Sequence, residues 1–265
     1  MAADLTALVD DLVDESAVLQ KILMPLTSGQ WRQATPAEGW TIADQVSHLA
    51  FFDEATLLSL VDPDRFRTEA EELIAGGMDF PDRLAERYRD LSGAQLLAWF
   101  ANSRRALAEA YRSADPAARL PWYGPGMGPA SSVTARLMET WAHGQDVADA
   151  LGVVRPATAR LRHIAHLGVR SLPYSYRVNG LEVPTQPIRV ELKAPDGDSW
   201  TWGPEDAVDR VTGAALDFCL VVTQRRHRSD TGLVVRGPVA GQWIGVAQAF
   251  AGAAGTGRRP LGEEQ

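Results

Sequence analysis

The first half of the chain carries apolar residues at the spacing of an α-helix. From Leu5 to Leu26 they recur at intervals of three and four, which places them on one helical face. Similar patterns run from Thr41 to about Leu60, from Ser92 to about Ser113 and from about Val133 to Leu151. Four helices of this kind in succession predict a four-helix bundle.

Capping signals predict where two of these helices begin or end. Thr41 is followed three residues later by Asp44, which is the spacing of a capping box at a helix start. Ser131 or Ser132 is expected to cap the last bundle helix at its start. Gly152 stands where that helix should end, because glycine readily adopts the left-handed conformation of a C-terminal cap.

The second half of the chain has a mixed pattern. Residues 188–192 alternate like a strand, a turn signal follows at 195–198, and 200–202 could return as the second strand of a hairpin. Residues 207–224 and 243–250 predict helices, and 233–235 predict another strand. The fold class is therefore α+β, with a helical bundle at 1–155, a helix and linker at 156–187, a smaller C-terminal α/β domain at 188–252 and a loose tail at 253–265.

Composition and charge exclude several kinds of function. The formal net charge is −8 in 265 residues, which argues against nucleic acid as the main partner. Cys219 is the single cysteine, so an intramolecular disulfide and cysteine-rich metal sites are excluded. The first residues lack the pattern of a signal peptide, and no apolar run approaches the ~20 residues of a membrane span. We expect a cytoplasmic protein with no membrane partner.

Three side chains form a candidate metal site. Glu139 and His143 lie four residues apart, so a helix places them on one face, one turn apart. His48, on another predicted bundle helix, could supply a third ligand. Zinc binds imidazole nitrogen and carboxylate oxygen, and three protein ligands leave a position open for catalysis. The alternative is a plain side-chain pair between Glu139 and His143, which chance also produces.

Two carboxylates lie close in sequence to these histidines and could fix their tautomers. Asp44 lies one turn before His48, and Asp146 lies three residues after His143. The alternative for Asp44 is the capping role described above. The alternative for Asp146 is a solvated helix position.

Two segments carry a family resemblance. Residues 39–49 (GWTIADQVSHL) and 139–152 (ETWAHGQDVADALG) resemble the mycothiol-dependent maleylpyruvate isomerase family, which belongs to the DinB-like metal-binding four-helix bundles. Residues 211–218 resemble part of the C-terminal α/β domain of that family. The chain is longer than the family's plainer members and is most similar to an uncharacterised metal-binding subgroup. Such proteins are found largely in actinobacteria.

The resemblance implies specific roles for residues. His48, Glu139 and His143 match the family's zinc ligands, and mycothiol is the implied cosubstrate. An arginine of the C-terminal domain assists catalysis in the characterised isomerase. Its nearest matches here are Arg226 and its neighbour Arg225. The alternative is that both arginines lie at a solvated helix end, where cations complement the helix dipole.

The implied chemistry is thiol transfer or isomerisation on a small electrophilic substrate. A thiol bound at the open metal position would have a lowered pKa and attack as a thiolate. Trp122 and Tyr123, in the loop before the last bundle helix, could line the substrate pocket, or simply form a rigid connection. A metal-dependent hydrolase, with Asp146 as general base, and a non-enzymatic metal or small-molecule binder are the alternatives. The electrophile, the identity of the metal and the oligomeric state are left open.

Overall fold

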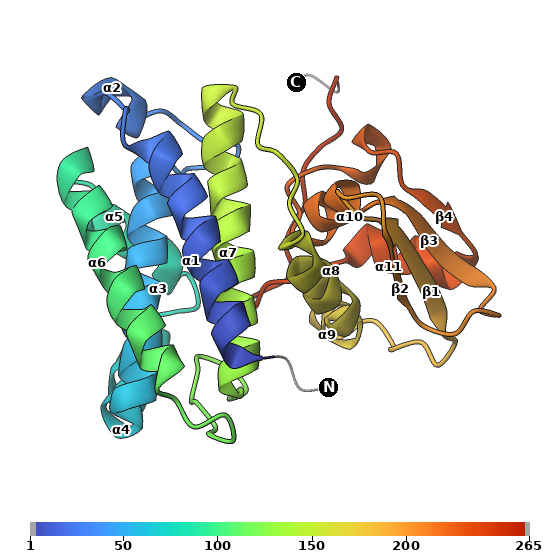
Figure 1. Cartoon of the computed structure of the whole chain (residues 1–265), viewed down its shortest axis with the longest axis horizontal. Helices are drawn as coiled ribbons and strands as arrows, with labels where there is room; N and C mark the ends of the chain where they lie inside the picture. Colours follow the sequence, from blue (N-terminus) through green and yellow to red (C-terminus); the bar gives the residue numbers. More distant parts are fainter. Residues whose placement is uncertain (1–3, 263–265) are drawn as a thin grey trace. The chain divides into compact units, whose positions relative to one another are not determined.

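The chain folds into two compact units, divided between Arg155 and Pro156. The computed structural model describes residues 4–262. Residues 1–3 and residues 263–265, the last part of the predicted tail, lie outside that range. The first unit is helical and the second contains a sheet, which confirms the predicted α+β class with an N-terminal bundle (Figure 1).

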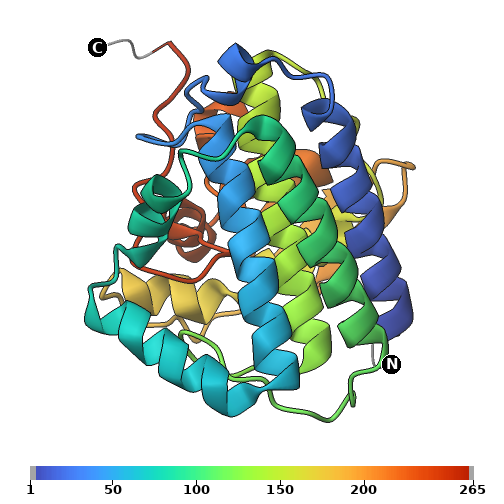
Figure 2. The same ribbon diagram turned by 90° about the vertical axis from the view of Figure 1, so that its left-hand side faces the viewer.

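Four long helices form the first unit. They are α1 (Leu5–Leu23), α3 (Ile42–Val61), α6 (Gly93–Arg112) and α7 (Pro129–Leu151), and they run side by side (Figure 2). The shorter α2 (Ser28–Trp31), α4 (Pro63–Ala75) and α5 (Phe80–Arg87) lie in the connections. Apolar side chains from all four long helices meet in one core, among them Leu23, Val46, Leu49, Phe100 and Val147. Burial of this shared face is the main force that stabilises the bundle.

The predicted caps are right for α3 and for the end of α7. The Thr41 backbone N–H donates to the Asp44 carboxylate at 2.8 Å, and the Thr41 hydroxyl accepts from the Asp44 backbone N–H, so the capping box is complete. Gly152 ends α7 with φ 66°. The predicted start of α7 at Ser131 or Ser132 is wrong, because Gly128 is its N-cap and Pro129, which suits the first helical turn, begins it.

A buried ionic cluster links all four bundle helices. The Arg104 guanidinium on α6 binds the Asp53 carboxylate on α3 through two hydrogen bonds, of 2.7 and 2.9 Å. It also donates to Ser16 on α1 at 2.9 Å and to Thr140 on α7 at 3.0 Å. Because a buried charge is tolerated only when it is paired, this cluster fixes how the four helices align.

The second unit contains a four-stranded sheet. In chain order its elements are α8 (Leu161–Arg170), α9 (Leu172–Val178), β1 (Ile188–Lys193), β2 (Ser199–Trp202), β3 (Asp209–Ala214), α10 (Ala215–Val222), the 3₁₀ turn η1 (Arg228–Asp230), β4 (Val234–Arg236) and α11 (Pro238–Val246). The strand order is β2-β1-β3-β4. The predicted hairpin is confirmed, since β1 and β2 pair antiparallel with Val190 opposite Trp202.

Two helices predicted for this unit are wrong in extent. Residues 207–224 were expected to form one helix, but β3 occupies the first part and α10 only the second. β3 pairs with β1 in parallel and with β4 antiparallel, and these pairings favour an extended backbone for its Val211 and Thr212. The helix predicted at 243–250 is α11, which starts earlier, at Pro238, and ends at Val246.

Among the described residues 4–262, the helices are all too short or too polar to cross a membrane.

Candidate metal centre

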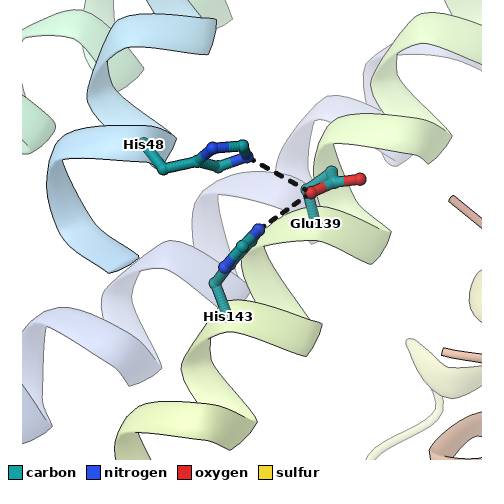
Figure 3. A group of neighbouring side chains, drawn as sticks. All are labelled: His48, Glu139 and His143. Atoms are coloured by element: carbon teal, nitrogen blue, oxygen red, sulfur yellow. Dashed lines mark hydrogen bonds and ion pairs between the residues drawn. The ribbon is translucent and has the colours of Figure 1, made fainter. Parts of the chain in front are cut away.

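The structure brings His48, Glu139 and His143 together between two helices of the bundle (Figure 3). His48 extends from α3, and Glu139 and His143 extend from successive turns of α7. Glu139 Oε2 lies 3.0 Å from His143 Nε2 and 3.6 Å from His48 Nε2. One ligand atom from each of the three residues lies within 4.8 Å of the others.

The spacing of these atoms fits a tetrahedral metal ion. Bonds of about 2.1 Å that meet at the tetrahedral angle separate their ligand atoms by about 3.4 Å. The two distances from Glu139 Oε2, 3.0 and 3.6 Å, lie on either side of that value. The donor set of two imidazole nitrogens and one carboxylate oxygen is also that of known catalytic zinc sites. The residues present therefore fit a divalent cation of this kind.

Gln45 orients one of the two imidazoles. Its side-chain Oε1 accepts a hydrogen bond from His143 Nδ1, and its Nε2 donates to the Thr35 hydroxyl at 2.9 Å. Because the amide oxygen accepts the proton on Nδ1, Nε2, which faces Glu139, is the nitrogen that a metal would bind. Gln45 is fully buried at the start of α3, so its amide has little freedom to turn away.

The electrostatic environment keeps the ligands in the protonation states that a metal requires. Burial, with a further contribution from the neighbouring His143, lowers the pKa of His48 to about 3, so this imidazole is neutral at neutral pH. Burial alone would raise the pKa of Glu139, but its interactions with His143 and His48 outweigh burial and hold that pKa well below its usual value. Buried His48 Nδ1 has no hydrogen-bond partner, so the protein constrains this ring less than that of His143.

Aromatic rings enclose the cluster. The Trp40 ring lies 5.3 Å from the His48 ring and stacks on the His143 ring at 5.9 Å. The Phe52 ring, one turn after His48 on α3, lies 4.5 Å from the His48 ring. The Trp40 indole N–H is held by Asp82 at 2.7 Å. The sequence analysis did not assign Trp40 and Phe52 to the site.

Trp122 and Tyr123 lie one aromatic ring away from the cluster. Their rings contact Phe52 at centroid distances of 6.1 and 5.6 Å, and Trp122 stacks on Phe66 of α4 at 5.7 Å. Burial raises the pKa of Tyr123, so its phenol remains protonated over the physiological range. Phe52 therefore links these two rings to His48, and their role in substrate binding stays a prediction.

The two carboxylates considered for orienting the histidines have different surroundings. Asp44 serves as the cap of α3 and accepts from Arg89 at 3.1 and 3.2 Å, which is the alternative that the sequence also allowed. The acceptor that the structure places beside His143 Nδ1 is Gln45, which was not among the predicted residues. Asp146 is completely buried on α7, so its alternative reading as a solvated helix position is wrong.

Arg226 lies in the second unit, just after α10. Gln224 adopts φ 57°, and the backbone N–H groups of Arg225 and Arg226 both donate to the Leu220 carbonyl, so the chain turns sharply there. The Arg225 side chain donates to the Thr223 carbonyl at 2.7 Å. The catalytic role of Arg226 stays a prediction.

Sequence reasoning missed two polar residues close to the cluster, Gln45 and Arg136. Gln45 lies three residues before His48, which a helix places on the same face, and this spacing could have indicated it. Arg136 lies one turn before Glu139 on α7 and is 4% exposed. An arginine at an inward position of a predicted bundle helix is a second signal that the sequence contained.

The fold and the site together define a helical bundle with a candidate metal centre, followed by a small α/β unit. A family model described as mycothiol maleylpyruvate isomerase N-terminal domain matches residues 12–148, and the chain belongs to this family. A second model, described as wyosine base formation, matches residues 184–234.

Relatives and solved structures support this assignment. Two proteins of Mycobacterium tuberculosis strains, "Uncharacterized protein MT0041" and "Uncharacterized protein Rv0036c", are 47% identical over 256 residues, which cover 97% of this chain and 100% of each relative. Two crystal structures of the mycothiol-dependent maleylpyruvate isomerase, one of them of a mutant, have the same fold, with TM-scores of 0.60 and 0.58. They share 14% sequence identity over 88% of this chain and 92% of theirs.

Proposed function

We propose that this protein is a metal-dependent thiol transferase or isomerase that activates a low-molecular-weight thiol for attack on a small electrophile. The convergence of His48, Glu139 and His143 from two helices carries the proposal. Membership of the mycothiol maleylpyruvate isomerase family supports thiol chemistry, and its name suggests mycothiol as the thiol. Zinc is the metal that this donor set suits best.

The chain's own residues prepare the site for this chemistry. His48, Glu139 and His143 would hold a divalent cation, which would lower the pKa of a bound thiol. Gln45 accepts from His143 Nδ1 and so reserves Nε2 of that ring for the metal. Trp40 and Phe52 pack against the histidine rings and reduce their contact with water, which strengthens electrostatic interactions within the site.

The reaction needs no nucleophile from the protein. In isomerisation, the thiolate sulfur adds to a carbon–carbon double bond of an unsaturated acid, the resulting single bond rotates, and the same thiolate leaves with the double bond restored. In transfer, the sulfur displaces a leaving group and stays attached. Cys219, the one cysteine of the sequence, is fully buried, and burial raises the pKa of its thiol, so it is unsuited to this role.

Metal content, thiol binding and turnover test the proposal in turn. The purified protein should contain about one zinc per chain. His48→Ala and Glu139→Gln should lose most of it, whereas His163→Ala, in the second unit, should retain it. In the cobalt-substituted protein, an added thiol should produce a sulfur-to-cobalt charge-transfer band. Mycothiol with maleylpyruvate is the first substrate pair for the activity assay.

Two outcomes would overturn the proposal. If wild type and His48→Ala contain equal, negligible amounts of metal, there is no metal centre to activate a thiol. If the cobalt protein forms but no thiol alters its spectrum, the chemistry is different. Turnover of esters or amides without added thiol would then identify a metal-dependent hydrolase.

A further inference from the structure

Arg136 is a buried cation whose hydrogen bonds are unsatisfied. It lies on α7 one turn before Glu139, and its side chain is 5% exposed. Its Nε and Nη2 atoms are buried without a hydrogen-bond partner. Leaving a buried charged donor unpaired costs free energy, so a native protein that keeps one usually has a use for it.

The surroundings of Arg136 place its charge beside the metal centre. Its guanidinium lies 5.9 Å from the centre of the Phe52 ring, and that ring lies 4.5 Å from the His48 ring. The Tyr123 ring, from the loop before α7, lies 5.6 Å from the same Phe52 ring.

In Arg104, the guanidinium edge formed by Nε and Nη2 binds a carboxylate. Nε and Nη2 of Arg104 hold the two oxygens of Asp53 at 2.7 and 2.9 Å. In Arg136 the corresponding pair has only Asp53 Oδ1 at 3.5 Å from Nε, a distance that makes an ion pair without a hydrogen bond. Within residues 4–262, Asp53 is already engaged by Arg104, and no carboxylate hydrogen-bonds to Nε or Nη2 of Arg136.

The charges of four neighbouring side chains, Arg104, Arg136, Asp53 and Glu139, also favour a bound carboxylate. Arg104 and Arg136 carry two positive charges, and Asp53 and Glu139 carry two negative charges. A divalent cation between neutral imidazoles would add two positive charges and leave the cluster with that excess. A thiolate at the metal would remove one of them, and a carboxylate at Arg136 would remove the other.

We infer that Arg136 binds a carboxylate of the electrophilic substrate and so positions that substrate beside the thiol. This inference rests on the proposed function and adds the residue that holds the acid group of the second substrate in place. Arg136 offers a planar pair of donors on one edge, which matches a carboxylate in two parallel hydrogen bonds. An acidic electrophile would thus be preferred over its ester or amide.

Thiols that carry a carboxylate can test this inference in the cobalt-loaded protein. Mercaptoacetate, 3-mercaptopropionate and 4-mercaptobutyrate differ in reach, and each has a matched alkanethiol without the acid. At least one acid should bind wild type about 10- to 100-fold more tightly than its alkanethiol. Arg136→Met should abolish this preference, and Arg136→Lys should retain part of it. A preference that persists in Arg136→Met would mean that the carboxylate chelates the cobalt instead, and would overturn the inference.

A metal-free measurement keeps the test independent of the proposed function. Propionate is titrated by calorimetry into chelator-treated wild type and Arg136→Met. Binding by wild type alone supports the inference even if no metal centre exists, and equal behaviour of both proteins refutes it. If wild type binds no metal or no thiol, the proposed function is overturned, and this outcome is distinct from the propionate result.

Thermal unfolding distinguishes a binding role from a structural one. If Arg136 serves a ligand, Arg136→Met should melt at or above the wild-type temperature, because an unsatisfied buried charge has been removed. Arg104→Met is the matched control, since it removes the partner of Asp53 and should melt lower. A large fall in melting temperature for Arg136→Met would show that it is a structural arginine.

Discussion

Gln45 provides the sharpest test of how the protein tunes its candidate metal centre. The change is Gln45→Leu, which keeps roughly the same volume and removes the acceptor of His143 Nδ1. The Gln45 amide is fully buried and donates to the Thr35 hydroxyl at 2.9 Å, so its orientation is fixed. Without it, the His143 ring would lose a pre-oriented acceptor. Removal of such an orienting partner weakens metal binding by about 10- to 100-fold, or about 1.4 to 2.7 kcal/mol.

Competition with a chromophoric zinc chelator at fixed pH measures this change as a ratio of dissociation constants. Gln45→Glu should bind zinc at least as tightly as wild type, because a carboxylate accepts the Nδ1 proton more strongly. Gln145→Leu is the matched control, since Gln145 on α7 donates to Asp149 at 2.8 Å instead. If Gln45→Leu and Gln145→Leu have the wild-type zinc affinity, the orienting role of Gln45 is refuted.

Three further predictions concern stability and reactivity. Arg104→Met should lower the free energy of unfolding by about 3–5 kcal/mol in urea titration, because Asp53 stays buried without its partner; a loss under about 1 kcal/mol would contradict this. Metal-free protein should lose stability as the pH falls from 6.5 toward 3, because the unfolded chain protonates His48 and the folded chain, with a pKa of about 3, does not. When the free energy of unfolding is plotted against pH, the slope should be about 1.4 kcal/mol per pH unit shallower in His48→Asn than in wild type. Equal slopes would refute the lowered pKa of His48. Cys219 should resist an aromatic disulfide reagent until the protein is unfolded, because it is buried with a raised pKa; rapid labelling of the native protein would be inconsistent with that.

Local signals in the sequence predicted the helical half of this protein well. The capping box at Thr41 and the terminal Gly152 depend on residues within a few positions of each other, so the pattern alone identifies them. Strand β3 was missed because its apolar residues also fit a helical period. What makes it a strand is pairing with β1 and β4, which lie on either side of it and come from other parts of the chain.

Some residues of the candidate site were likewise visible in the sequence, and others only in the structure. The spacing of Glu139 and His143 on one helix was visible in the sequence, and so was His48 on a second predicted bundle helix. The family resemblance then matched all three to metal ligands. Gln45 and Arg136 acquire their significance only from three-dimensional packing: one from the imidazole that it contacts, the other from the partner that it lacks. Periodicity shows that a residue faces inward, but not what it meets there.

The origin of the three ligands on two helices has a consequence for the lifetime of the fold. A cation shared by α3 and α7 would be a removable cross-link between distant parts of a chain that has a single cysteine and hence no internal disulfide. Loading would stabilise the native state in proportion to the logarithm of free metal concentration. The supply of zinc around the protein would then govern how long each molecule persists, as well as how fast it works.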